Sequence, residues 1–154
     1  MTSWPEILTH ARDLLIAYVL VLPVGWNRER DERSAGLRTF PLVAMASCGF
    51  VLLAVGVLGR ESTGQARILE GLIAGIGFIG GGAILKAGHT VRGTATAASL
   101  LTTGVVGGAV GYGLYDIAAI LAVMNFVTLN VSVPLKRSAA ESALPSGSRG
   151  PVRE

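Results

Sequence analysis

The stretch GIGFIGGG, from Gly75 to Gly82, has the residue types and spacing that most resemble a known chemical site. Its first six residues match the G-x-G-x-x-G pattern of a dinucleotide-binding turn, in which glycines let backbone N–H groups approach a pyrophosphate. Glycines at similar spacing also let two helices approach closely inside a membrane. The first interpretation predicts a soluble enzyme, and the second predicts an integral membrane protein.

The residues around these glycines do not complete a nucleotide site. A dinucleotide-binding turn needs an acidic residue about 20 positions later, but no Asp or Glu occurs between Glu70 and Asp116. Lys86 lies between Leu85 and Ala87, which does not match a Walker phosphate loop. The sequence offers no identifiable nucleophile–base pair either. We therefore expect neither enzymatic activity nor a bound cofactor.

The composition favours a membrane protein. The chain is 51% hydrophobic and 15% charged, whereas an average soluble domain is about 25% charged. Its charges are clustered and leave long uncharged stretches, as a bilayer requires. The basic pI of about 9.5 is not accompanied by lysines and arginines interleaved with aromatic residues, so nucleic-acid binding is not expected.

The apolar stretches predict an all-α integral membrane protein with five transmembrane helices in a glycine-rich, tightly packed bundle. Each span needs about 20 apolar residues, because a helix rises about 1.5 Å per residue. The predicted spans are residues 7–26, 40–59, 68–85, 94–115 and 117–135, within one membrane domain over residues 1–135. Residues 136–154 are rich in Ser, Gly, Pro and Arg and are expected to form a disordered cytoplasmic tail.

The positive charges predict the orientation of these spans. Cytoplasmic segments collect Lys and Arg, and an N-out, C-in arrangement puts ten of the thirteen basic residues on the cytoplasmic side. The opposite orientation would invert this count.

Glycines four residues apart lie on one face of a helix, which predicts close helix packing. The predicted packing glycines of the third span are Gly71, Gly75, Gly77 and Gly81, and those of the fourth are Gly104, Gly107, Gly108 and Gly111. Three successive glycines, Gly80 to Gly82, also allow a helix break or re-entrant turn beside a functional cavity. Both interpretations remain open from the sequence.

A charged turn separates the first two spans. Seven of the eleven residues from Arg28 to Arg38 are charged. One interpretation is a solvated loop that carries orientation charges. The other gives Arg38 and Thr39, just before Phe40, a binding role, since an arginine there can bridge backbone carbonyls, acidic partners or lipid phosphate.

Three blocks of sequence, NRERDERSAGLRTF, ARILEGLIAGIGFIGGGAIL and VRGTATAASLLTTGVVG, resemble the signature blocks of the MgtC/SapB membrane protein family in order and spacing. The matching positions are Gly25, Arg28, Glu29, Gly36, Leu37, Arg38, Thr39, Gly75, Gly77, Phe78, Gly80, Gly82, Arg92, Gly93, Thr96 and Ala97. The chain departs from the family pattern at Asn27, where the family has an acid, at Phe40, where it has a His, and at Leu101, where it has an aromatic residue.

The resemblance implies a multi-pass protein of the bacterial inner membrane, linked to magnesium limitation, stress adaptation and, in pathogens, virulence. It implies a non-enzymatic regulator of other membrane proteins, such as ATP synthase or transporters. The residues it suggests for partner binding are Arg28, Glu29, Gly36, Arg38, Thr39, Arg92 and Thr96. A homo-oligomer is a further possibility.

The alternative hypothesis is a small transporter or channel for magnesium or another cation. Magnesium prefers oxygen ligands and keeps several of its waters. Asp13 and Glu70 are the acids to consider, because each lies where a predicted span begins. A carboxylate drawn into the bilayer centre would need a partner.

Overall fold

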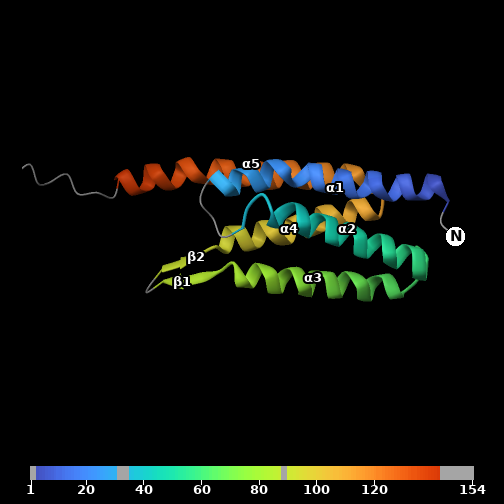
Figure 1. The fold of residues 1–154 in the computed structure, drawn as a ribbon. Helices are drawn as coiled ribbons and strands as arrows, with labels where there is room; N and C mark the ends of the chain where they lie inside the picture. The colour runs from blue at the N-terminus through green and yellow to red at the C-terminus, as the bar shows by residue number, and fades with distance from the viewer. Residues whose placement is uncertain (1–2, 31–34, 88–89, 143–154) are drawn as a thin grey trace, which may run out of the picture.

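The computed structural model describes residues 3–30, 35–87 and 90–142, with the backbone alone for residues 87 and 131–142. In this part of the chain, five α-helices and one hairpin follow each other along the sequence. They are α1 (Trp4–Arg30), α2 (Thr39–Leu58), α3 (Gly64–Gly82), β1 (Leu85–Ala87), β2 (Thr90–Arg92), α4 (Thr94–Gly111) and α5 (Tyr115–Ser142). The strands pair antiparallel, with Leu85 opposite Arg92. Successive helices run in opposite directions along one long axis (Figure 1).

The predicted all-α membrane fold is confirmed. Three helices, α1, α2 and α4, are long and apolar enough to cross a bilayer, and the apolar part of α5, Tyr115–Asn130, is shorter. That all five helices cross the membrane, and that residues 1–135 form the membrane domain, remain predictions.

Several helix ends differ from the predicted span ends, among them that of α4, which ends at Gly111 rather than residue 115. The third span was expected to reach residue 85, but α3 ends at Gly82 and Leu85 begins a strand. Glycines have low helix propensity, so a helix ending in three of them stops easily. The tail was expected to begin at residue 136, but α5 continues to Ser142, because no proline or glycine interrupts residues 136–142. The rest of the predicted tail lies outside the described residues.

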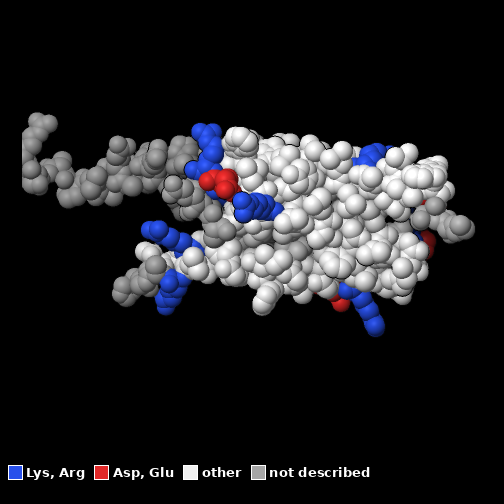
Figure 2. All heavy atoms as spheres, viewed as in Figure 1, with Lys and Arg blue, Asp and Glu red and all other residues white. Residues whose placement is uncertain are grey.

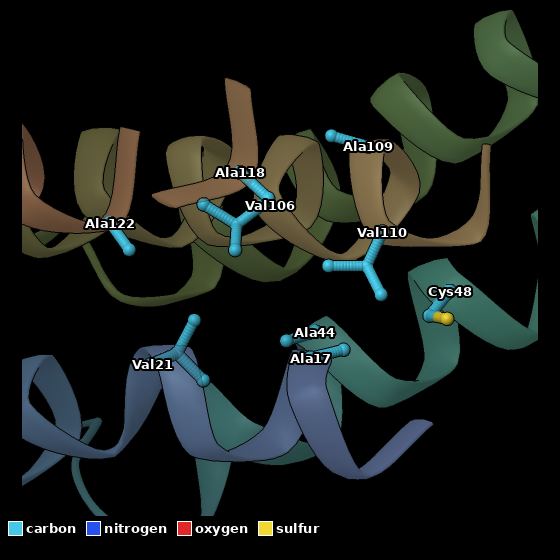
Figure 3. Close-up of a cluster of buried hydrophobic side chains, with 9 residues drawn as sticks. All are labelled: Ala17, Val21, Ala44, Cys48, Val106, Ala109, Val110, Ala118 and Ala122. Carbon is cyan, nitrogen blue, oxygen red and sulfur yellow. The ribbon is translucent and has the colours of Figure 1, made fainter. Parts of the chain in front are cut away.

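Helix α4 occupies the centre of the bundle and contacts all four other helices. Eleven of its eighteen residues are buried. The main core cluster combines small side chains from α1, α2, α4 and α5, among them Ala17, Ala44, Cys48, Ala109 and Ala118 (Figure 3). Small side chains let these helix backbones come close together, which suits packing in lipid.

The closest approach joins α4 to α2. A Cβ atom at Gly107 would collide with the backbone carbonyl of Ala44, and one at Gly111 would lie 2.9 Å from the Cys48 carbonyl oxygen. Gly104 faces α3 instead, where the Ile76 side chain fills the space that a Cβ would need. Gly108 is buried but has room for a methyl group, since its nearest neighbours would be 3.9 Å away.

The glycines of α3 behave differently. A Cβ at Gly71, Gly75, Gly77 or Gly81 would meet nothing within 4 Å among the described atoms, and all four residues are exposed. They therefore make no close helix contact with the described residues. A packing role for them remains a prediction about another molecule.

Three buried residues of α3 anchor the helix to the rest of the bundle. Gln65 accepts a hydrogen bond from the Tyr112 hydroxyl at 2.8 Å, Ile76 inserts at Gly104, and Gly80 packs against Ala97. These three are the buried residues of α3. The other residues of α3 are partly or fully exposed.

We expect Gly107→Ala to destabilise the folded protein, because the added methyl group must push apart the α2 and α4 backbones. Overpacking of this kind costs about 1–3 kcal/mol, more than the roughly 0.5–1 kcal/mol that Ala gains over Gly within a helix. Thermal unfolding of the purified protein in detergent measures the effect. Gly77→Ala is the matched control and should leave the melting temperature unchanged or higher. Equal losses in both variants would show that the α2–α4 contact is not the tight one.

The antiparallel order of the helices allows a direct test of orientation. A reporter fused after Arg137 should be active in the cytoplasm, and one inserted in the loop of residues 59–63 should be active outside, because the positive charges favour N-out, C-in. Activity on the same side of the membrane at both sites would contradict the five-span arrangement.

Candidate functional site

The turn between α1 and α2 is built by residues of the first sequence block. The Glu29 carboxylate accepts a hydrogen bond from the Leu37 backbone N–H, with Glu29 Oε2 3.1 Å from Leu37 N. Its side chain lies directly over Gly36, where any Cβ would collide with Glu29 Oε2. A Cβ at Gly25 would lie 3.3 Å from the Leu37 Cα. The contacts of Glu29, Gly25 and Gly36 therefore hold the start of α2 against α1.

The second and third sequence blocks meet at the hairpin. Gly93 has a positive φ of 92°, and a Cβ there would collide with the carbonyl oxygen of Ala83. A Cβ at Gly80 would lie 3.2 Å from the Ala97 carbonyl oxygen. Thr96 is 2% exposed in the first turn of α4. The glycines here bring the end of α3 and the start of α4 into contact, and no nucleotide-binding turn is formed.

We call the end of the bundle that carries β1 and β2 the hairpin end, and the opposite end the loop end. Because the helices alternate in direction, the α1–α2 turn also lies at the hairpin end. Basic side chains gather there (Figure 2). Arg30, Arg38, Lys86 and Arg92 are exposed, and in the described part of the chain no ion pair holds any of them. Arg28 differs, since it is 4% exposed and interacts within the structure.

The predicted partner-binding residues thus fall into two groups. Arg38, Thr39 and Arg92 lie at the hairpin end with at least part of the side chain reachable from outside. Arg28 and Thr96 are buried, and Glu29 and Gly36 are engaged with each other in the turn. The second group supports the local structure that presents the first.

Three polar contacts between helices were not found from the sequence. Asn27 donates to the side-chain oxygen of Asn130 at 2.8 Å, which joins α1 to α5. The Ser99 hydroxyl donates to Asn125 Oδ1 at 2.8 Å, which joins α4 to α5. Since each pair is far apart in the sequence, only the helix packing reveals it. Asn27 departs from the family pattern, which has an acid at this position. An amide suits this chain because its N–H can donate to Asn130, which an ionised acid could not do.

The third contact involves Asp13, one of the two acids considered for magnesium. Asp13 is 5% exposed, and its Oδ1 accepts hydrogen bonds from Arg12 Nη2 at 2.9 Å and from the Tyr115 hydroxyl at 2.8 Å. Glu70 is exposed on α3, while α2 and α4 lie between α3 and α1 (Figure 1). The two carboxylates therefore do not form one site. Among the described residues, no three His, Cys, Asp or Glu side chains gather as a metal site would require.

Two hollows on the surface of the described residues lie beside charged side chains. The larger is an apolar groove of about 720 Å³ between α2 and α3, with Arg38 and Arg67 among its lining residues. The smaller, of about 240 Å³, lies at the loop end beside Asp13, Arg12 and Tyr115. The Ser47 hydroxyl on the wall of the larger groove is buried, and no described group forms a hydrogen bond with it.

The turn gives a testable prediction about Gly36. Gly36→Ala should displace the Glu29 carboxylate and release the Leu37 N–H, which costs about 1–3 kcal/mol if that group stays unsatisfied. We expect a lower melting temperature and a smaller folded fraction in the membrane. Gly49→Ala is the control, because a Cβ at Gly49 meets nothing within 4 Å. The capping role would be refuted if Gly36→Ala melted like Gly49→Ala.

Several known proteins have sequences similar to this chain. The family model described as the MgtC family matches residues 14–138. An uncharacterized protein of Synechocystis, slr0014, is 39% identical over 131 residues, which are 85% of this chain and 53% of that protein. Protein MgtC of Brucella abortus is 34% identical over 149 residues, 97% of this chain and 62% of that protein.

A third relative, YhiD of Escherichia coli K12, is provisionally named a magnesium transporter and is 32% identical over 124 residues, 77% of this chain and 58% of that protein. The chain thus spans between half and two thirds of the length of these three relatives. No solved structure matches it. On the extent of the family match and the identity to these relatives, the chain belongs to the MgtC family.

Proposed function

We propose that this protein is a non-enzymatic regulator in the bacterial inner membrane, linked to magnesium limitation, which acts by docking on other membrane proteins. The observation that carries the proposal is the hairpin end, where exposed cations stand on a turn and hairpin braced by glycine contacts. Arg38 and Arg92 have no ion-pair partner among the described residues. Unpaired cations on backbone that is already held by close contacts suit an acidic surface of a partner protein, since less conformational freedom is lost on docking.

The packing of the bundle is less suited to the alternative, a magnesium transporter. Transport sites usually place polar or charged groups near the middle of the membrane. The buried polar groups on α2, α4 and the apolar part of α5 are hydroxyls and one amide, namely Ser47, Thr96, Ser99, Thr103 and Asn125. Asp13, the buried acid of α1, is engaged by Arg12 and Tyr115. The transporter hypothesis is favoured by the name of YhiD, and the experiment below decides between the two.

The proposal predicts separate effects on growth and on ion flux. In a strain that lacks the gene, Arg92→Glu should fail to restore growth in low magnesium, because charge reversal repels an acidic partner. The variant should still insert and melt like the wild type, since Arg92 is exposed. Glu61→Lys, which reverses an exposed charge in the loop that joins α2 to α3, is the matched control and should restore growth.

Magnesium flux into liposomes that contain the purified wild-type protein should equal the flux into empty vesicles. Magnesium uptake down its gradient, lost on Asp13→Asn or Glu70→Gln, would make the protein a transporter and overturn the regulatory proposal.

A further inference from the structure

We propose that the groove between α2 and α3 is a binding site for one anionic phospholipid, with its phosphate at Arg38 and an acyl chain lying along the groove. The site shares Arg38 with the docking surface proposed above, but its remaining residues lie between α2 and α3, and Arg92 does not line it. It would exist whether the protein regulates other proteins or transports ions.

The groove arises from the way α3 is attached. Ile76 at Gly104 and Gly80 at Ala97 draw α3 toward α4, which leaves its other side separated from α2. Gly71 and Gly75 line that side and carry no side chains to fill it. Leu42 and Phe50 of α2 form the opposite wall and remain exposed, at 60% and 57%. A hollow of about 720 Å³ results.

The membrane environment determines what can fill this hollow. The groove is apolar over most of its lining and opens sideways on the bundle, so in a bilayer it faces hydrocarbon. Water is excluded from such a surface because it finds no hydrogen-bonding groups there. The occupant is therefore a lipid chain or another transmembrane helix.

The dimensions favour the lipid chain. From Arg38 to Phe50 the α2 wall is about 18 Å long, at about 1.5 Å per residue. A helix about 10 Å wide and of that length occupies about 1,400 Å³, so it could place only one face in a groove of about 720 Å³. An acyl chain is much thinner and can lie fully inside it.

The charges favour an anionic head group at one end. Arg38 immediately precedes α2 and lines the mouth of the groove, and it is exposed. No described residue forms a hydrogen bond or ion pair with its guanidinium. Its planar fork can bind two phosphate oxygens at once, and the positive end of the α2 dipole lies beside it. Basic pockets between helices at a membrane surface are suited to anionic head groups.

Arg67 is at the other end of the groove, in the first turn of α3. Because α2 and α3 run antiparallel, the two cations lie at opposite ends and cannot bind one phosphate together. Arg38 is thus the residue that selects the proposed lipid. Arg67 is available to lipids of the opposite membrane face.

Native mass spectrometry of the purified, delipidated full-length protein tests the proposal. Phosphatidylglycerol and phosphatidylcholine with identical acyl chains are added at the same concentrations. We expect one phosphatidylglycerol to bind in preference to phosphatidylcholine. Arg38→Ala should weaken that binding about fivefold or more, as expected for the loss of one cation at a head group, and Arg38→Lys should be intermediate.

Two further variants separate head-group and chain binding. Arg92→Ala removes a cation at the same end that does not line the groove, so it should bind like the wild type. Gly75→Leu should narrow the groove and weaken both lipids while the melting temperature holds, since a Cβ at Gly75 meets nothing within 4 Å. Equal binding of both lipids to the wild type, or equal losses in Arg38→Ala and Arg92→Ala, would overturn the proposal.

A second copy of the chain in the groove is the competing result. In a Cys48→Ala background, Ala46→Cys puts a thiol on the groove wall. Efficient disulfide crosslinking between two copies in membranes, unaffected by added phosphatidylglycerol, would assign the groove to a dimer and refute the lipid site. Little crosslinking, or crosslinking suppressed by phosphatidylglycerol, supports the lipid site.

Discussion

The contact between α4 and α2 at Gly107 and Ala44 is the constraint on which the rest of the bundle depends. In lipid, helices gain little from hydrophobic burial, so their association relies on close packing. Gly107 and Gly111 bring the α4 backbone against the Ala44 and Cys48 carbonyls of α2. With α4 held in the centre, α1, α3 and α5 each have a surface to pack on. The small residues of the core cluster continue this close packing outward (Figure 3).

Close contacts at glycines also shape the hairpin end, where they have a different role. There Gly36, Gly80 and Gly93 allow close contacts among the helix ends and the segments next to them, and those contacts support the exposed cations. Glycine is needed at Gly93 for a second reason, because its φ of 92° lies in the region that residues with a Cβ avoid. Many of the residues that match the family pattern therefore support the local structure. A smaller number are exposed and could contact a partner, above all Arg38 and Arg92.

Much of the fold could be predicted from the sequence, and the features that were missed were missed for physical reasons. Apolar length and clustered charge predict helices and a membrane, because both reflect the cost of polar groups in hydrocarbon. Glycine spacing predicts which residues share a helix face but not what that face contacts. Gly104 and Gly71 were therefore both predicted to pack, although among the described residues Gly104 has a close neighbour and Gly71 has none. The hairpin was missed because strands of three residues carry too little pattern. The contact of Asn27 with Asn130 depends on helix positions that no local sequence encodes.

The open glycine face of α3 connects the fold to the proposed lipid site. Glycine in a helix is costly when it packs against nothing, since Ala would stabilise the helix by roughly 0.5–1 kcal/mol per position. Gly71 and Gly75 are therefore unfavourable for α3 as an isolated element, and the bundle does not use them for contact. Their effect is to keep space open beside α2, where Arg38 stands at one end. A wall of small residues next to an unpaired cation is suited to a ligand with an apolar chain and an anionic head, and a phospholipid has both.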